Sequence, residues 1–249
     1  MNPIIKINNL RRVFHVGSET VNALKGISFE VTEGEFVSIM GTSGSGKSTL
    51  LNILGCLDRP TEGEYLIDNI SVSERSEDEL STVRNRKIGF VFQSYNLLSR
   101  TSALENVELP LLYNNEVSAS ERRERAIHAL EQVGLQDRMY HMPNQLSGGQ
   151  QQRVAIARAL VNDPVILLAD EATGNLDTRT SYEIMSLFQE LNAKGKTIAF
   201  VTHESDIAAF TNRTIMLRDG HIVKNEVVKP QSARAMLEAL PPSEDYSFN

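Results

Sequence analysis

The stretch that decides the fold is EFVSIMGTSGSGKSTL, residues 35–50. Its apolar half, residues 36–40, predicts a short buried strand that stops at Gly41. The residues GTSGSGKS at 41–48 match the pattern G-x-x-x-x-G-K-[ST], and leucines and isoleucines at helical spacing predict a helix over 48–57. A strand, a glycine-rich loop and a helix in this order predict a phosphate-binding loop in an α/β protein.

The loop has the chemistry that a nucleoside triphosphate requires. Glycines let backbone N–H groups curve around phosphate oxygens, and a helix that begins at Lys47 directs the positive end of its dipole at the anion. Lys47 adds a charge for the β- and γ-phosphates, and the Ser48 hydroxyl can bind Mg²⁺. The alternative is a Gly/Ser turn with an exposed lysine, which the strand before it and the helix after it disfavour.

A second apolar run, VILLADE at residues 165–171, ends in two acids. A strand of this kind places its last side chains at the carboxyl edge of a sheet, where open α/β sheets bind their ligands. There Asp170 can reach Mg²⁺ through water, and Glu171 can orient or deprotonate an attacking water molecule. The alternative is a solvated acidic pair at the end of a strand, and the neighbouring phosphate loop favours the catalytic interpretation.

Composition excludes several classes of protein. The 249 residues are 41% hydrophobic and 23% charged, which is typical of a globular protein with a sizeable core. No stretch approaches the roughly 18 apolar residues of a membrane span, and the N-terminus lacks the apolar region of a secretory signal. A formal net charge of -7 disfavours nucleic acid as a partner, and the single Cys56 cannot form a disulfide within the chain.

Hydrophobic patterning predicts a mixed sheet with a helical insertion. Loose alternation over residues 4–31 predicts antiparallel strands. The remaining expected elements are strands at 63–70, 88–92, 165–169 and 197–202, a capped helix over 118–133, a helix over 181–192, and a hairpin over 215–223 that turns at Asp219-Gly220. The helical insertion covers about 94–161, and residues 229–249 form a tail with one weak helix and frayed last residues.

A third motif makes the pattern specific. The residues LSGGQ at 146–150, the signature segment, are followed by QQRVAIARAL at 151–160. Together they resemble the signature of ATP-binding-cassette (ABC) ATPases. Three further elements occur in the order typical of the family: Gln93 after its strand, Asn175-Leu176-Asp177 after Glu171, and His203 after the strand at 197–202. The resemblance covers roughly residues 4–228 and implies the ABC-ATPase fold: a P-loop NTPase α/β core, an N-terminal antiparallel β subdomain and a helical subdomain over about 94–161.

The resemblance also implies an ATPase that uses Mg²⁺ and closes as a head-to-tail homodimer on two ATP molecules. A helix that begins at Ser147 with two glycines offers free N–H groups, so the signature of one chain can bind ATP held by the other. The implied catalytic residues are Lys47, Gln93, Glu171 and His203. The implied nucleotide-binding residues are Phe14, Val21, Gly41, Thr42, Ser43, Gly44, Ser45, Gly46, Lys47, Ser48, Thr49, Ser147, Gly148, Gly149, Gln150 and Asp177. The implied metal ligands are Ser48, Gln93 and Asp170.

Two positions depart from the family pattern. Phe14 lies where the family more often has a tyrosine that stacks on adenine, and the alternative for Phe14 is a core residue. Ala172 stands where proline usually follows the glutamate. As a lone histidine, His203 would more often be structural, and its order after Gln93 and Glu171 favours contact with the γ-phosphate.

Several stretches resemble the exporter-type cassettes of the MacB, LolD and FtsE group, with MacB the nearest. This implies a permease with few membrane spans and an extracytoplasmic domain, an adaptor protein outside the membrane, and a cassette on the cytoplasmic face of the cell membrane. Because the sequence ends shortly after the cassette, we expect the permease to be a separate subunit that exports macrolides, peptides or lipoproteins. Residues 93–99, with Tyr95, Leu97 and Leu98, are the expected docking surface, and the alternative is that they start the helical core.

Other functions remain open from the sequence. The first is an FtsE-like cassette that drives an envelope or cell-division complex and transports nothing. The second is a soluble cassette acting on DNA or ribosomes, which the single set of motifs and the net charge of -7 disfavour. The third is an ATP-binding module that does not hydrolyse, which Glu171 disfavours.

Overall fold

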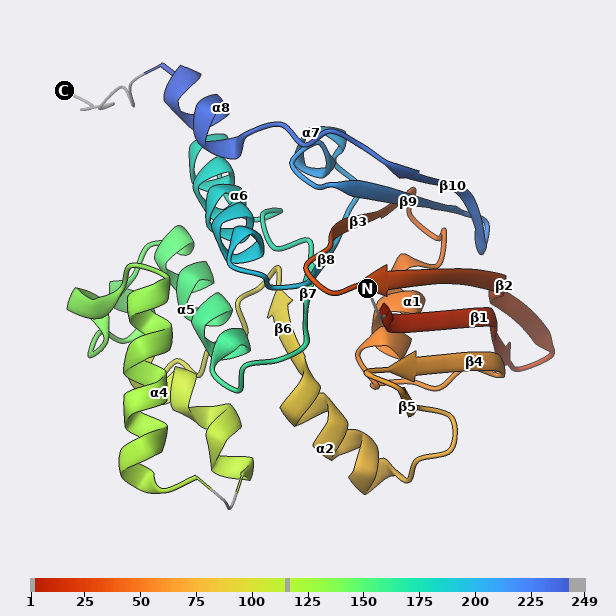
Figure 1. Cartoon of the computed structure of the whole chain (residues 1–249), viewed down its shortest axis with the longest axis horizontal. Helices are drawn as coiled ribbons and strands as arrows, with labels where there is room; N and C mark the ends of the chain where they lie inside the picture. The colour runs from red at the N-terminus through yellow and green to blue at the C-terminus, as the bar shows by residue number, and fades with distance from the viewer. Residues whose placement is uncertain (1–2, 115–116, 242–249) are drawn as a thin grey trace.

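The computed structural model describes residues 3–114 and 117–241, and it contains two sheets with helices around them. Figure 1 shows helices α4 and α5 at one end of the molecule and the strands β1, β2 and β4 at the other, with the larger sheet between them. The predicted fold class, with an α/β core, an antiparallel β part and a helical part, is confirmed.

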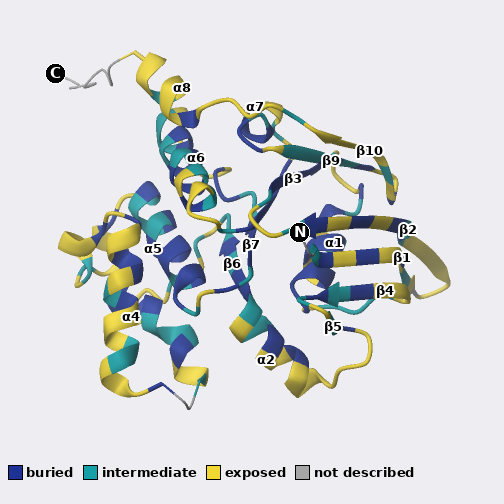
Figure 2. Cartoon of the chain, viewed as in Figure 1, coloured by how far each residue is buried: buried dark blue, intermediate teal, exposed yellow. Residues whose placement is uncertain are grey.

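The larger sheet has six strands in the order β10-β9-β3-β8-β7-β6. Its strands are β3 (Phe36–Gly41), β6 (Ile88–Phe92), β7 (Ile166–Asp170), β8 (Ile198–Thr202), β9 (Arg213–Arg218) and β10 (His221–Val227). All neighbours are parallel except β9 and β10, which form the predicted hairpin. The strands β3, β7 and β8 are buried on both faces, as parallel strands between two layers must be, whereas β10 is mostly exposed (Figure 2).

The smaller sheet is antiparallel and has the order β2-β1-β4-β5. Its strands are β1 (Pro3–Val16), β2 (Glu19–Thr32), β4 (Glu62–Ile67) and β5 (Ile70–Ser71). The sequence predicted one strand over 63–70, and the structure divides it because Asp68 and Asn69 both have positive φ and form a tight turn. The mixed sheet expected from patterning is therefore two sheets.

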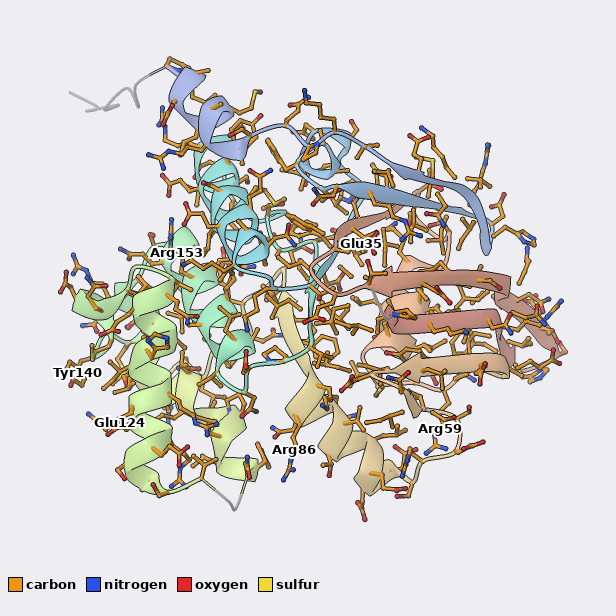
Figure 3. All side chains as sticks on the ribbon, in the orientation of Figure 1. Glu35, Arg59, Arg86, Glu124, Tyr140 and Arg153 are labelled. Atoms are coloured by element: carbon orange, nitrogen blue, oxygen red, sulfur yellow. The ribbon has the colours of Figure 1, made fainter. Side chains whose placement is uncertain are left out.

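The helices of the described chain lie on both faces of the larger sheet. They are α1 (Lys47–Leu54), α2 (Glu77–Lys87), α3 (Ala103–Glu108), α4 (Ala119–Gln132), α5 (Gly148–Leu160), α6 (Thr178–Ala193), α7 (Ser205–Ala208) and α8 (Ala233–Ala239), with 3-10 turns η1 (Leu109–Tyr113), η2 (Gln136–Arg138) and η3 (Pro143–Gln145). Arg153 on α5 donates to the Val133 carbonyl at the end of α4, which ties the helical part together (Figure 3).

Two hydrophobic cores result from this arrangement. The helical-side core joins α3, α4, α5 and α6 to one face of the larger sheet, and the strand-side core joins α1 and the antiparallel sheet to the other. Strand β7 contributes to both, because Leu167 and Ala169 face the first core and Ile166 and Leu168 face the second. The larger sheet therefore lies between the two cores and has no solvent-exposed face along β7.

Two helix boundaries differ from the sequence expectation by three residues. Helix α1 ends at Leu54 rather than residue 57, because Cys56 has a φ of 53° and breaks the helix. Helix α6 begins at Thr178 rather than 181, and helix α4 has Ser118, one of the two serines considered, as its N-cap. The weak tail helix is α8, and the expected fraying of the last residues lies outside the described part of the chain.

Helix α2 had no counterpart in the sequence expectation. Its residues are mostly charged, and only Leu80 and Val83 are buried, so it has almost no hydrophobic pattern. A capping box at Ser76 and Glu79 starts the helix, three acids occupy its first turn and three basic residues its last. Capping and charge order, rather than hydrophobic periodicity, mark α2 as a helix.

Candidate active site

A cavity of about 1290 Å³ opens at the carboxyl ends of β3, β7 and β8, where the sheet order predicts a ligand site. Of the predicted site residues, those that line it are Val21, Gly41, Thr42, Ser43, Gly44, Gly46, Lys47, Ser48, Thr49, Asp170, Glu171 and His203. The structure thus brings together the phosphate loop (residues 41–48), both acids that follow β7 and the histidine that follows β8.

The phosphate loop is wound tightly between β3 and α1. Gly46 has a φ of 103° and is the N-cap of α1, and a Cβ atom at Gly41 would lie 2.4 Å from the Ser45 Oγ. The Ser45 hydroxyl is buried without a hydrogen-bond partner, and the Lys47 Nζ donates to the carbonyls of Gly41 and Thr42. An orphaned hydroxyl and a lysine folded onto its own loop fit an anion site, because phosphate oxygens would satisfy both groups.

Asp170 ends β7 at the base of the cavity. Burial and the neighbouring Glu171 carboxylate raise its pKa, and the Lys47 ammonium lowers it in part. A carboxylate that the protein leaves short of compensating charge is a suitable partner for a divalent cation. The described residues contain no group of three His, Cys, Asp or Glu side chains that could hold a metal ion, so Mg²⁺ would need oxygen ligands from phosphate, Ser48 and water, as it commonly does.

Glu171 has the unusual backbone conformation of the site, with a φ of 45°. Its N–H donates to the Val201 carbonyl on β8, and its own carbonyl accepts from the Gly174 N–H, so the left-handed turn is held on both sides. Its Oε1 lies 2.9 Å from the Nδ1 of His203, whose ring is more exposed than the carboxylate. The structure therefore pairs the predicted base with the predicted histidine at the mouth of the cavity.

Gln93 follows β6 and pairs with a residue that the sequence did not assign to the site. Its Nε2 donates to the Asn175 Oδ1 at 3.2 Å, and the Asn175 Nδ2 donates to the Gln93 carbonyl at 3.1 Å. A Cβ atom at Gly174 would lie 2.7 Å from the Gln93 Nε2, so the pair needs a glycine beside it. Gln93 does not line the cavity, and its contact with Mg²⁺ or phosphate stays a prediction.

The signature segment (residues 146–150) lies elsewhere on the chain. Ser147 is the N-cap of α5, its hydroxyl accepts from the Gln150 N–H, and the Gln150 side chain returns the bond to the Ser147 N–H. The predicted cap is confirmed. None of Ser147, Gly148, Gly149 and Gln150 lines the cavity of its own chain, so the first turn of α5 is a second surface with N–H groups at a helix start.

Asp177 has a structural task in this chain. It is the N-cap of α6, its Oδ1 accepts from the Thr180 N–H at 3.0 Å and its Oδ2 from the Thr180 hydroxyl at 2.6 Å. These hydrogen bonds lower the pKa of the carboxyl group. Asp177 does not line the cavity, and its predicted part in nucleotide binding is untested by this geometry.

Phe14 is half-buried near the end of β1 and lies opposite Val21 in the β1–β2 register. Val21 lines the cavity, and Phe14 itself does not. The Arg12 guanidinium covers the ring with its Cζ 4.4 Å from the ring centroid. The aromatic residue therefore lies beside the cavity, on an exposed hairpin, rather than in the hydrophobic core.

The turn between β9 and β10 braces the phosphate loop, and the sequence indicated it only as a hairpin. The Gly220 N–H donates to the Ser45 carbonyl at 3.1 Å, and the Gly220 carbonyl accepts from the Lys25 N–H at 2.9 Å. The Asp219-Gly220 pair identified the turn but carried no signal that it would touch a loop about 175 residues away in sequence.

Within the described residues, no helix is both long and apolar enough to cross a membrane.

Comparisons with known proteins identify the family of the chain. A family model described as ABC transporter matches residues 24–174. The chain is 57% identical over 220 residues to the uncharacterized ABC transporter ATP-binding protein YknY of Bacillus subtilis, covering 88% of this chain and 95% of that protein. It is 53% identical over 226 residues to the macrolide export ATP-binding/permease protein MacB of Chlorobium phaeobacteroides, covering 91% of this chain and 34% of that protein.

A solved structure shows the same fold. It is the dimeric post-hydrolysis state of the ATP-binding cassette MJ0796 of Methanocaldococcus jannaschii, bound to ADP and Pi. The TM-score is 0.81 at 51% identity, and the match covers 91% of this chain and all of that chain. With its phosphate loop, its acidic strand end and its signature helix in place, the chain belongs to the ABC transporter family, as an ATP-binding-cassette ATPase.

Proposed function

We propose that this chain is the ATP-hydrolysing subunit of an exporter-type transporter, that it dimerises on ATP and that it drives a separate membrane permease. The observation that supports this most is the separation of two anion-binding surfaces on one chain. The phosphate loop lines the cavity, whereas the first turn of α5 does not. Each surface can complete a nucleotide site only with a second copy of the chain, and the MJ0796 cassette is a dimer.

Within one site, positioning and charge carry most of the catalysis. Lys47 and the loop amides would hold the β- and γ-phosphates, and Ser48, Gln93 and Asp170 would hold Mg²⁺, which would neutralise phosphate charge. Glu171 orients the attacking water and accepts its proton, and its hydrogen bond to His203 keeps the carboxylate at the mouth of the cavity. The signature of the second chain covers the γ-phosphate from the other side.

The permease has a candidate docking groove at a second cavity of about 410 Å³, between α2, β6, η1 and α5. The stacked rings of Phe90 and Phe92 form part of its wall, with centroids 5.4 Å apart, and Tyr113 stands at its edge 81% exposed. An apolar groove with an exposed aromatic rim suits an amphipathic segment of a partner. Of the stretch 93–99, which the sequence indicated as the docking surface, Asn96 lines this groove.

Three residues of that expected surface differ in their exposure. Leu98 is 50% exposed, but Leu97 packs against the helical-side core and Tyr95 is half-buried against the start of α5. Arg158 on α5 donates to the carbonyls of Tyr95 and Asn96, at 2.7 and 2.5 Å, and fixes this loop beside the groove. The docking surface we propose therefore comprises the groove, Tyr113 at its edge, and Leu98, which lies two residues after the groove-lining Asn96.

The relatives support the exporter assignment and a separate permease. YknY, which this chain covers almost end to end, is named as an ATP-binding protein alone, whereas MacB is named as an ATP-binding/permease protein for macrolide export. We infer that the cassette works on the cytoplasmic face of the membrane, with a permease of few spans and an extracytoplasmic domain, and an adaptor beyond it. Macrolides, peptides or lipoproteins are the cargo classes.

Mixing two inactive variants tests the composite site. Ser147→Arg should leave ATP binding to one chain intact and abolish dimer closure and hydrolysis, whereas Lys47→Ala should weaken ATP binding directly. In a mixed dimer one composite site carries both lesions and the other carries neither, so hydrolysis should return on mixing. Ser120→Arg, an exposed serine near the start of α4, is the matched control. If Ser147→Arg weakens ATP binding to the monomer as much as Lys47→Ala does, the proposed arrangement is wrong.

A further inference from the structure

The Arg12 side chain, which lies over the Phe14 ring, is held by a bidentate ion pair with Asp58. Asp58 accepts two parallel hydrogen bonds from Arg12, from Nε to Oδ2 and from Nη2 to Oδ1, each 2.8 Å long. Both side chains are about three-quarters buried. A bidentate pair of this geometry fixes the plane of the guanidinium as well as its position. Arg12 therefore presents a rigid, flat cation to one face of the Phe14 ring.

The backbone under this pair is also fixed. The Val13 N–H donates to the Thr61 hydroxyl, and the Thr61 N–H donates to the Arg11 carbonyl. The register of β1 and β2 shifts between Arg12 and Val13, which is a strand irregularity of the kind that redirects a side chain. Segment 58–61 therefore holds β1 on both sides of Arg12, at the register shift two residues before Phe14.

Asp58 connects this end of the site to the phosphate loop. The N–H groups of Leu57 and Asp58 both donate to the Asn52 carbonyl in the last turns of α1, and α1 begins at Lys47. Strand β2 also packs closely against the phosphate loop: a Cβ atom added at Gly46 would lie only 2.7 Å from the Ala23 carbonyl oxygen. The aromatic ring and the phosphate loop thus belong to one rigid unit.

We propose that Arg12, held by Asp58, is a positioning residue for the nucleotide base: it fixes the Phe14 ring and leaves only the opposite ring face for adenine. This rests on the proposed function, in which Phe14 stacks on adenine. The Arg12 guanidinium makes a cation–π interaction with one face of the Phe14 ring, and the purine stacks on the other face. The connection through α1 sets the distance between the base platform and the phosphate loop.

The test measures dissociation constants of the full chain for two probes, ATP and inorganic tripolyphosphate, in the absence of turnover. Tripolyphosphate has the phosphates but no base, so it reports the phosphate loop alone. We expect Phe14→Ala and Arg12→Ala each to raise the dissociation constant for ATP about three- to ten-fold, and to leave that for tripolyphosphate unchanged. Asp58→Asn should also raise the dissociation constant for ATP, but by a smaller factor.

A double variant identifies the ring as the target of Arg12. In the Phe14→Ala background, Arg12→Ala should have no further effect on ATP binding, because its effect acts through the ring. The matched control is Arg11→Ala. Arg11 is a neighbouring, half-exposed arginine that pairs with Glu62 at 3.6 Å, and its substitution should leave the dissociation constants for both probes unchanged. Arg12→Lys keeps a cation but loses the fork, and should fall between wild type and Arg12→Ala. It also serves as the test variant if Arg12→Ala does not fold.

The outcomes separate the two proposals. If Phe14→Ala leaves ATP binding unchanged, the base platform of the proposed function is wrong, and the role of Arg12 falls with it. If Phe14→Ala weakens ATP binding and Arg12→Ala does not, the platform stands and the role of Arg12 is wrong. An equal loss for tripolyphosphate, or an equal effect of Arg12→Ala with and without Phe14, would also overturn the proposal.

Discussion

At the scale of single residues, Glu171 combines backbone strain with chemistry. A non-glycine residue with a φ of 45° is uncommon, and it persists here because the Val201 carbonyl and the Gly174 N–H bind its backbone on either side. The turn directs the carboxylate away from the sheet and toward His203. Because these backbone hydrogen bonds do not involve the carboxylate, Glu171→Gln can change the side chain without changing the backbone. The substitution therefore reports on the chemistry of the carboxylate.

We expect Glu171→Gln to bind ATP normally, to lose about 10² to 10⁴-fold in turnover and to accumulate an ATP-bound dimer, because general-base contributions are of this order. Single-turnover hydrolysis and light scattering measure the two effects. The exposed Glu190 on α6, as Glu190→Gln, is a matched control that should keep wild-type turnover. Near-normal single turnover in Glu171→Gln would remove it as the base.

The amide pair of Gln93 and Asn175 gives a second residue-scale prediction. In the structure, the hydrogen bond from the Gln93 Nε2 to the Asn175 Oδ1 holds the Gln93 side chain against the loop that follows Glu171, whereas the Asn175 Nδ2 bonds the Gln93 main-chain carbonyl. The first of these bonds competes with any contact of the Gln93 side chain to phosphate or Mg²⁺. We expect Asn175→Ala to tighten Mg²⁺-ATP binding about two- to five-fold, the usual net worth of a hydrogen bond or two. Equilibrium titration measures this, and the gain should vanish in a Gln93→Ala background. Unchanged or weaker binding in Asn175→Ala would contradict it.

Much of the cavity could be predicted from sequence, since the phosphate loop, Asp170, Glu171 and His203 lie in short motifs whose spacing alone indicates their chemistry. Arg12 and Asp58 could not be predicted, because each acts through a partner 46 residues away and carries no local pattern. Asn175 stands in a family motif, but its pairing with Gln93, 82 residues away, could not be predicted. Long-range side-chain pairs become visible only when the fold brings the two segments together.

At the scale of elements, helix α2 shows where hydrophobic patterning fails. Buried strands such as β3, β7 and β8 were predicted within one residue or so, because continuous apolar runs identify them. In α2, two buried residues leave nothing for periodicity to detect, and the stabilisation comes from the capping box and the charged ends. Arg59 reaches the start of α2 and bonds the Arg75 carbonyl and Glu77, which ties the helix to the segment after α1 (Figure 3).

This capping makes α2 sensitive to acid. Hydrogen bonds from the Ser76 N–H, Arg75 and the Ser76 hydroxyl lower the pKa of Glu79 from 4.5 to about 2. A depressed folded-state pKa stabilises the protein above pH 4.5, and that stabilisation disappears as the pH falls from 4.5 toward 2. We expect Glu79→Gln to lower the Tm at neutral pH, and its difference from wild type to shrink through this window.

Thermal unfolding of wild type and Glu79→Gln between neutral pH and about pH 3 measures the effect. The control is Glu74→Gln, a nearby exposed glutamate outside the helix, whose Tm should follow wild type at every pH. A difference between wild type and Glu79→Gln that does not change with pH would show that the carboxylate charge contributes nothing to the cap.

At the scale of the whole molecule, the second groove joins four elements from three separate stretches of the sequence, since β6 follows directly on α2. Helix α2, strand β6, the turn η1 and helix α5 each contribute a few side chains, and no stretch of sequence contains more than a part of the surface. This is why the stretch 93–99, taken from sequence as the docking surface, contributes only Asn96 to the lining of the groove. The exposed residues of the proposed surface, Leu98 and Tyr113, come from two separate segments.

We expect Leu98→Asp and Tyr113→Asp to leave the basal ATPase of the isolated chain intact and to abolish its co-purification with the proposed permease. A charge at either position adds a desolvation cost to an apolar contact and changes nothing in the nucleotide cavity. Tyr140→Asp is the matched control, since Tyr140 is 66% exposed on the helical part and does not line the groove. Co-purification of both variants at the wild-type yield would contradict the docking proposal.

Because the chain has two hydrophobic cores, we expect its two sides to exchange amide hydrogen for deuterium separately. The phosphate loop is attached to the strand-side core through Leu50 and Ile53, whereas α5 is attached to the helical-side core through Val154 and Ile156. Nucleotide bound to a single chain contacts only the strand side, so deuterium uptake should slow in β3 and α1 and continue unchanged at the start of α5. Slower uptake at residues 147–151 is therefore a signature of the closed pair of chains, readable without a membrane or a cargo.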